Sequence, residues 1–260
     1  MKYIQLFKTH IQVSLAYRME PLVWFIISSI STFTIALILF NAASSNAFTN
    51  YNSGQVATYI VLSFVLERFL IWYFAYWFGN SINRGKLSFD LIKPFKYLVE
   101  PVVSEFTGKI IYTIPYIFIS IFLIIYFGGR ININTNAIPI FIIIFALAIC
   151  INITIAYMLS FVAFFTIKNN SVVSFFFGII PLLSGRSFPL DIMPTQIFNI
   201  LTLTPFPYTF FYPVKILSSN LASIDYLKVI FIQITWLFMF ILIATYMHKK
   251  GIKKYESAGI

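Results

Sequence analysis

Long uncharged stretches alternate along this chain with shorter segments that hold its charged residues. The first of them, residues 22–40, contains no charged side chain. At about 1.5 Å per helical residue, its length matches the hydrocarbon core of a bilayer, about 30 Å thick. The pattern predicts one all-α integral membrane domain over residues 1–260. Its six predicted transmembrane spans are residues 22–40, 56–78, 110–127, 138–167, 172–183 and 229–247.

Two of these spans depart from a regular crossing. Residues 138–183 are too long for one helix, and the polar break at residues 168–170 divides them. Without the short span at 172–183 the basic C-terminal tail would lie on the outer side, so we keep it and expect it to be helical only part of the way. Pro115 predicts a kink in the third span, because proline removes a helix hydrogen bond.

The first 20 residues predict an amphipathic helix that lies in the membrane interface. Apolar residues such as Tyr3, Phe7 and Ile11 recur at helical spacing, and Lys2 and Lys8 lie opposite them, toward anionic lipid headgroups. The alternative is a frayed polar tail. The segment has no compact apolar centre, so it does not predict a cleavable signal peptide.

The distribution of basic residues predicts the orientation. Thirteen of the 18 Lys and Arg residues fall on one side of the predicted membrane, four fall on the other, and Arg68 lies within a span. Basic residues concentrate in cytoplasmic segments, so both termini are expected in the cytoplasm. This predicts a multi-pass protein of the cytoplasmic (inner) membrane with lipid as its surroundings.

Composition excludes several classes of function. With 60% hydrophobic and 10% charged residues, a water-soluble domain of this size would lack the polar surface it needs. The net charge of +10 is spread along span flanks rather than gathered in a patch, so nucleic acid is not an expected partner. Cys150 is the one cysteine, and His10 and His248 lie at opposite ends of the chain. We therefore expect no metal, no cofactor bound by this chain and no catalytic site.

One stretch is similar to a phosphate-binding loop but does not satisfy its requirements. Five residues separate Gly79 from Gly85, where the loop needs four, and Leu87 stands where a magnesium-binding hydroxyl is required. The chain is not expected to bind ATP at this position.

Glu67 and Arg68 lie in the middle of the second span. Each charge there costs about 2.5–3.5 kcal/mol on insertion scales, so it needs a compensating partner or function. Neighbouring residues point about 100° apart on a helix, so we expect them not to share one narrow pocket. They line a hydrated substrate path or subunit seam, or they form a structural polar link; both interpretations remain open. Asn152 and Thr154 of the fourth span are candidate partners, with packing between helices as their alternative role.

Two longer segments between spans differ in kind. Residues 80–109, on the cytoplasmic side, mix charged residues with regularly placed apolar ones and predict an amphipathic surface segment. Residues 184–228, on the outer side, are apolar and aromatic but contain five prolines, which forbid one continuous helix. Short re-entrant or interfacial helices are expected there.

Three stretches together resemble the permease family of type-two ABC exporters, in its compact six-span branch. They are residues 82–87 (INRGKL) running into 90–94 (DLIKP), residues 183–189 (LSGRSFP) with Met193 and Pro194, and residues 204–206 (TPF) followed by Pro213. With the N-terminal helix and the tail 255–259, the similarity covers nearly the whole chain. The tail ends in Gly259-Ile260, where relatives often have paired glycines.

The resemblance implies a cytoplasmic coupling helix between spans two and three that docks on a separate ABC ATPase subunit, which binds ATP and magnesium. A solvated loop without a partner is the alternative. The residues that the resemblance assigns to coupling are Arg84, Gly85, Lys86, Leu87, Asp90, Lys93, Pro94, Tyr97, Glu100 and Glu105. Those that it assigns to an outer re-entrant gate are Ser184, Gly185, Arg186, Phe188, Pro189, Asp191 and Pro194.

The resemblance further implies a permease that pairs with a second copy of itself or with a related permease. Its substrate would be an amphiphilic, drug-like, peptide or lipid-linked compound that leaves the cell. Two other functions compete with this one. A secondary transporter or channel should show inverted repeats and several buried ionisable groups, and only Glu67 and Arg68 qualify. A non-transporting membrane scaffold would not account for the patterned coupling segment.

Overall fold

A computed structural model of the chain describes residues 2–16, 19–45, 53–93, 96–126, 133–218 and 225–255. Every regular element in these ranges is a helix, which confirms the all-α class. The predictions that concern Pro94, Arg130 and residues 256–260 lie outside the described residues.

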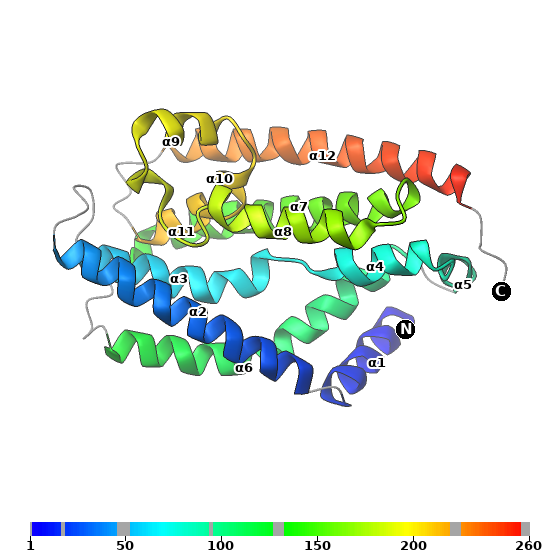
Figure 1. Ribbon diagram of the computed structural model, residues 1–260, viewed down its shortest axis with the longest axis horizontal. Coiled ribbons are helices and arrows are strands. Elements are labelled where there is room, and N and C mark those ends of the chain that lie inside the picture. The colour runs from blue at the N-terminus through cyan, green and yellow to red at the C-terminus, as the bar shows by residue number, and fades with distance from the viewer. Residues whose placement is uncertain are drawn as a thin grey trace.

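Long helices lie side by side and form one elongated bundle (Figure 1). Four helical runs are long and apolar enough to cross a membrane: Phe25–Ser44, Ser53–Asn83, Thr135–Phe164 and Tyr226–Lys254. They correspond to α2 (Met19–Ser44), α3 (Ser53–Leu70) with α4 (Phe74–Asn83), η1 (Thr135–Ala137) with α7 (Ile138–Phe161) and η2 (Val162–Phe164), and α12 (Tyr226–Lys254). A fifth span is present if the two bent halves of α6 (Val99–Tyr126) count as one crossing.

The bend in α6 amounts to 46°, between Val99–Ile111 and Thr113–Tyr126. Pro115 lies within the second half, and its ring nitrogen cannot donate to the carbonyl of Ile111. The predicted kink in this helix is therefore confirmed. The apolar helix α8 (Asn169–Leu183) is shorter than a full span, in line with the expectation that this segment is helical only part of the way. A sixth crossing stays a prediction.

Two helices differ in extent or continuity from the predicted spans. The span expected at 56–78 is not continuous, because residues 71–73 are not helical and separate α3 from α4. The helix expected from residue 110 begins at Val99, so the charged residues Glu105 and Lys109 lie on α6 rather than on a surface segment. Lys109 is only 4% exposed. The two differences are connected. Glu105 and Lys109 of α6 bond the backbone next to the non-helical residues 71–73.

The two ends of the bundle carry different short elements. At one end α1 (Lys2–Ala16) packs on α6, and α5 (Leu87–Leu91) lies beyond α4 near both termini (Figure 1). At the other end lie η3 (Leu190–Ile192), α9 (Thr195–Thr202), α10 (Phe206–Thr209) and α11 (Phe211–Ser218). Pro189, Pro194 and Pro205 immediately precede three of these helices. The prediction of a helical N-terminal segment and of short, proline-separated helices in the outer segment is confirmed.

Close packing joins α12 to α7, α10 and η2, and α4 to α8. Gln233 of α12 is fully buried, and its Nε2 donates to the carbonyls of Ile144 (3.0 Å) and Tyr208 (2.8 Å). Gly251, near the end of α12, lies so close to Phe164 that a Cβ at this position would collide with the ring. Gly79 of α4 approaches the Asn169 amide of α8 in the same way. These small residues permit helix contacts that larger ones would prevent.

We expect Gly251→Ala to destabilise the protein, because the added methyl group must displace the Phe164 ring. Overpacking of this kind costs about 1–3 kcal/mol. The measurement is the apparent Tm of the detergent-purified protein. Gly178→Ala is the matched control, since nothing lies within 4 Å of a Cβ at that helical position. Equal Tm values for the two variants would contradict the close packing of α12 on η2.

Candidate functional site

The break between α3 and α4 leaves backbone groups without helical partners in the middle of a long apolar run. A helix end exposes unpaired carbonyls and a helix start exposes unpaired N–H groups, and neither is tolerated in an apolar environment without a partner. At this break the end of α3 and the start of α4 are separated by only three residues, 71–73. Both kinds of partner are therefore needed close together.

Lys109 and Glu105 of α6 supply these partners. Lys109 Nζ donates to the carbonyl of Ile71 and, at 2.8 Å, to that of Arg68. The Glu105 carboxylate accepts from the N–H groups of Tyr73 (2.8 Å) and Phe74 (2.6 Å). A cation thus lies at a helix C-terminus and an anion at a helix N-terminus, the favourable arrangement for each helix dipole. Lys109 Nζ and Glu105 Oε1 are 3.2 Å apart, so the two residues also form an ion pair with each other.

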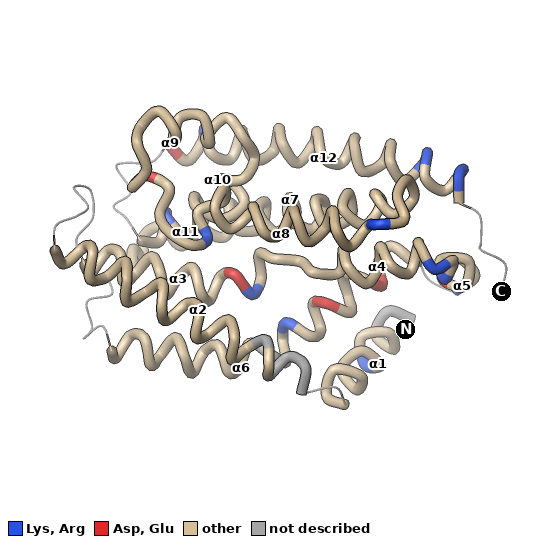
Figure 2. Tube along the Cα trace, in the orientation of Figure 1, with Lys and Arg blue, Asp and Glu red and all other residues tan. Residues whose placement is uncertain are grey.

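A large cavity adjoins this break. Its volume is about 1190 Å³, and its walls come from α2, α3, α4, α6 and residues 181–187. Figure 2 shows a group of acidic and basic positions between the two ends of the bundle, where α3 and α6 approach each other. The charged residues that line the cavity are Glu67, Arg68, Glu105, Lys109 and Arg186. Its volume exceeds that of a typical small-molecule site, about 300–1,000 Å³.

Glu67 joins α3 to the outer segment. Its carboxylate forms an ion pair with the Arg186 guanidinium, and both side chains are largely buried. Tyr59, also on α3, donates its hydroxyl hydrogen to the carbonyl of Gly185 at 2.5 Å. Gly185 has φ +82°, and a Cβ there would lie 2.9 Å from Phe211 Cβ. Gly185 and Arg186, the two predicted gate residues that contact α3, thus lie in a turn whose positive φ favours glycine.

The remaining predicted gate residues surround this turn. Ser184 accepts, through its carbonyl, from Phe211 N at 2.9 Å. Asp191 pairs with Lys215 of α11 at 2.7 Å. Phe188 packs against the cluster of buried residues that includes Leu190 and Phe210, while Pro189 and Pro194 precede η3 and α9. The structure brings this set together in one folded unit.

Arg68 lies differently from Glu67. Its guanidinium carbon is 4.4 Å from the centre of the Tyr116 ring, and its Nη1 donates to the Tyr116 hydroxyl over a long 3.4 Å. Both Glu67 and Arg68 line the same cavity, which is wide enough to receive two neighbouring side chains that point apart. The prediction was that Glu67 and Arg68 would not share one narrow pocket, and the cavity that both line is a wide one.

Asn152 and Thr154 bond backbone carbonyls rather than Glu67 or Arg68, in agreement with the packing role that the sequence left open for them. Asn152 Nδ2 donates to the carbonyls of Ala148 (2.9 Å) and Thr209 (3.3 Å). Thr154 donates to the carbonyl of Cys150 within its own helix. Both residues contribute to helix structure and packing, and neither lines the cavity.

The residues assigned to coupling form a compact turn beyond α4. Gly85 has φ +72° and turns the chain into α5, where Leu87 is fully buried. Lys93 pairs with Asp90 (2.8 Å) and Glu100 (2.7 Å). Burial lowers the pKa of the Lys93 ammonium, but the two carboxylates outweigh this effect and raise the pKa above its usual value. Lys93 therefore stays charged and holds the two ends of the segment together.

Tyr97 attaches the same segment to the end of α12. Its hydroxyl hydrogen-bonds His248 Nε2, and the two rings stack with centroids 6.0 Å apart. Burial raises the pKa of Tyr97 to about 12, so the hydroxyl stays protonated at neutral pH. Arg84 and Lys86 are exposed beside it. Among the described residues of the predicted coupling set, only Glu105 lies away from this turn, at the break between α3 and α4.

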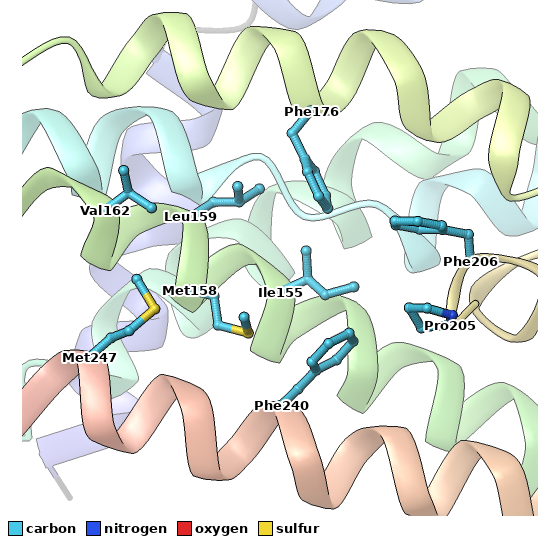
Figure 3. A pocket seen from close by; sticks show the side chains of 9 residues that line it. All are labelled: Ile155, Met158, Leu159, Val162, Phe176, Pro205, Phe206, Phe240 and Met247. Atoms are coloured by element: carbon cyan, nitrogen blue, oxygen red, sulfur yellow. The ribbon is translucent and has the colours of Figure 1, made fainter. Parts of the chain in front are cut away.

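A second cavity lies between α7, α8 and α12 and is wholly apolar (Figure 3). It measures about 350 Å³. Its lining residues are Ile155, Met158, Leu159, Val162, Phe176, Pro205, Phe206, Phe240 and Met247. It offers no polar group to orient a ligand, so the charged cavity is the better candidate for a functional site. Within the described ranges, no three His, Cys, Asp or Glu side chains lie close enough to hold a metal ion.

Sequence reasoning missed Tyr116 and the role of Lys109. Tyr116 looks like an ordinary aromatic residue of a span, and Lys109 like one of several basic residues at its cytoplasmic end. The one available signal was the spacing of Glu105 and Lys109, which places them on one face of a helix.

The long apolar helices and the charged cavity between them define a multi-pass α-helical membrane protein. The profile of the family described as ABC-2 family transporter protein matches residues 11–259, and the chain belongs to this family. A search of the curated proteins found no match. Family membership confirms the resemblance to type-two ABC permeases. The chain is thus a membrane transport component of a family that generally works with ABC ATPase subunits and is generally not itself catalytic.

Removal of Lys109 should destabilise the break between α3 and α4. Lys109→Met leaves the Glu105 carboxylate and two carbonyls without their cation, and breaking a buried pair costs about 3–5 kcal/mol. The measurement is thermal unfolding of the purified protein. Lys250→Met, on the exposed end of α12, is the control. The double variant Glu105→Gln/Lys109→Met should recover part of the loss. An unchanged Tm for Lys109→Met would contradict the assigned role.

Proposed function

We propose that this chain is the permease subunit of an ABC exporter and that its substrate passes through the charged cavity. The observation that carries this proposal is that one cavity is bordered both by the helix leading to the coupling segment and by the outer segment. α4 continues directly into the turn before α5, and Arg186 belongs to the outer segment. ATP is bound and hydrolysed by a separate ATPase subunit. A channel or scaffold needs no such connection.

The proposed topology has six crossings: α2, α3 with α4, α6, α7, α8 and α12. α1, α5 and the C-terminal end of α12 lie at the same end of the bundle (Figure 1), which supports a common, cytoplasmic side for them. Lys and Arg gather at this end (Figure 2), as expected for a cytoplasmic surface. In this arrangement α9, α10 and α11 form the outer side, and the protein resides in the cytoplasmic membrane.

The exposed apolar residues of the coupling segment support a docking role. Phe89, Leu91 and Ile92 are exposed to 55%, 48% and 81%, although they lie at an end of the molecule that is rich in charge. Leu87 anchors α5 to the bundle. The groove of an ATPase subunit covers this apolar edge, and movement of the subunit turns α4 about residues 71–73. The cavity changes shape because α4 forms part of its wall.

The Glu67–Arg186 ion pair acts as the outer closure of the cavity. It holds the turn at residues 184–186 against α3 together with the Tyr59–Gly185 hydrogen bond. Opening to the outside breaks both contacts. The subunit works in a pair, with a second copy or a related permease, and exports an amphiphilic substrate.

Replacement of Ile92 by Asp should weaken binding of the ATPase subunit by 10-fold or more, because a charge would have to enter an apolar groove. The measurement is co-purification of a co-expressed ABC ATPase subunit with the permease. Leu227→Asp is the control, because Leu227 has the same exposed fraction of 81% but lies at the start of α12, at the other end of the bundle. Undiminished co-purification of the Ile92 variant would refute docking at α5.

Loss of the Glu67–Arg186 pair should open the cavity to the outside. In a Cys150→Ser background, Ser63→Cys places a single thiol on the cavity wall. Adding Glu67→Gln should accelerate its reaction with an impermeant maleimide in intact cells by several-fold. Asn152→Asp, away from the cavity, is the control for a polar change elsewhere in the bundle. Identical labelling rates with and without Glu67 would show that the pair does not close the path.

A further inference from the structure

We propose that the cavity binds an amphiphile with one oxyanion group, such as a phosphate, sulfonate or carboxylate, and that Arg68 receives this group. The proposal rests on the proposed function, in which the cavity is the substrate path, and it names the class of substrate. The evidence is the balance of charge inside the cavity, the surroundings of Arg68 and the apolar remainder of the wall.

The charged residues of the cavity are three basic and two acidic, and four of them pair with each other. Glu67 pairs with Arg186 and Glu105 pairs with Lys109. Arg68 has no carboxylate within ion-pair distance among the residues that the structure describes. The cavity therefore has one excess positive charge, and it lies on Arg68.

The guanidinium of Arg68 retains most of its hydrogen-bonding capacity. The contact of its Nη1 with the Tyr116 hydroxyl is long, and its Nε has no partner in the described chain but is enclosed by protein, so the Nη groups are the donors that face a ligand in the cavity. Arginine carries five N–H donors in a planar fork that fits two oxygens of an oxyanion. The centre of the Tyr116 ring lies 4.4 Å from the guanidinium carbon, and the Tyr116 hydroxyl is itself hydrogen-bonded to Ser28 at 3.0 Å. Arg68 is thus oriented by an aromatic residue and available to a ligand.

The rest of the wall suits an apolar tail. Next to the charged residues, the cavity is lined by Ile27, Ile35, Ile60, Phe64, Ile71 and Pro181. A molecule with a charged head and an apolar body satisfies both parts of the wall. A cationic amphiphile does not, because each carboxylate of the cavity already has its own cation. The arrangement thus selects for the sign of the headgroup.

Binding of three detergents that share a dodecyl chain tests the inference directly. They are dodecyl phosphate, dodecyl maltoside and dodecyltrimethylammonium, measured on the purified permease in nanodiscs of neutral lipid. We expect dodecyl phosphate to bind at least 10-fold more tightly than the other two. Arg68→Gln should abolish this preference. Arg68→Lys should retain part of it, since lysine keeps the charge but not the fork.

Controls separate loss of the site from loss of the fold. Lys250→Gln removes an exposed charge at the end of α12 and should leave the preference intact. Tyr116→Phe removes one hydroxyl but keeps the ring and should weaken dodecyl phosphate binding by only about two- to three-fold. If Arg68→Gln does not elute as a folded species, the comparison of wild type, Arg68→Lys and Tyr116→Phe still tests the site.

The source of the anion is decided by competition. Nanodiscs that contain phosphatidylglycerol will suppress dodecyl phosphate binding if a membrane lipid headgroup occupies Arg68, and will not if a separate amphiphile does; both results support an oxyanion site. Equal affinity of wild type and folded Arg68→Gln for dodecyl phosphate, or tighter binding of the cationic detergent, overturns the proposal. Binding needs no ATPase subunit, so a failure of dodecyl phosphate to stimulate ATP hydrolysis in the complex would count against the exporter function alone.

Discussion

The organisation of this protein depends on satisfying the backbone where its second long helical run is interrupted. Inside an apolar environment, unpaired carbonyl and N–H groups are not tolerated, and water cannot replace the missing partners. Glu105 and Lys109 of α6 meet this requirement on both sides of residues 71–73. The contact also fixes the position of α6, and with it the cavity that lies between α2, α3 and α6.

The same interruption divides the protein into functional regions under the proposed function. α3 carries Glu67 and Arg68 and is joined to the outer turn, whereas α4 leads to α5 and the coupling segment. Because the two helices are not one rigid rod, α4 is able to turn while α3 keeps its contacts. Glu105 and Lys109 both belong to α6, so a turn of α4 does not separate these two charges from each other.

The sequence predicts the features that depend on local pattern. Apolar length identifies the long helices, and prolines such as Pro194 and Pro205 predict the short outer helices. Glu67 and Arg68 stand out because charge is rare in a span. What the sequence does not reveal is pairing across the chain. Arg186 lies 119 positions from Glu67, and the four-residue spacing of Glu105 and Lys109 places them on one helix face without indicating which backbone groups they bond. The three-dimensional structure is needed to show that Arg186 pairs with Glu67 and that Glu105 bonds the backbone at the break.

The close approach of Gly79 to Asn169 has a mechanical consequence. Since the Asn169 side chain of α8 lies directly against the Gly79 backbone of α4, a displacement of one helix is expected to move the other. α8 leads directly into the turn that holds Arg186. Under the proposed function, α8 would therefore provide a second route by which movement of α4 reaches the Glu67–Arg186 closure.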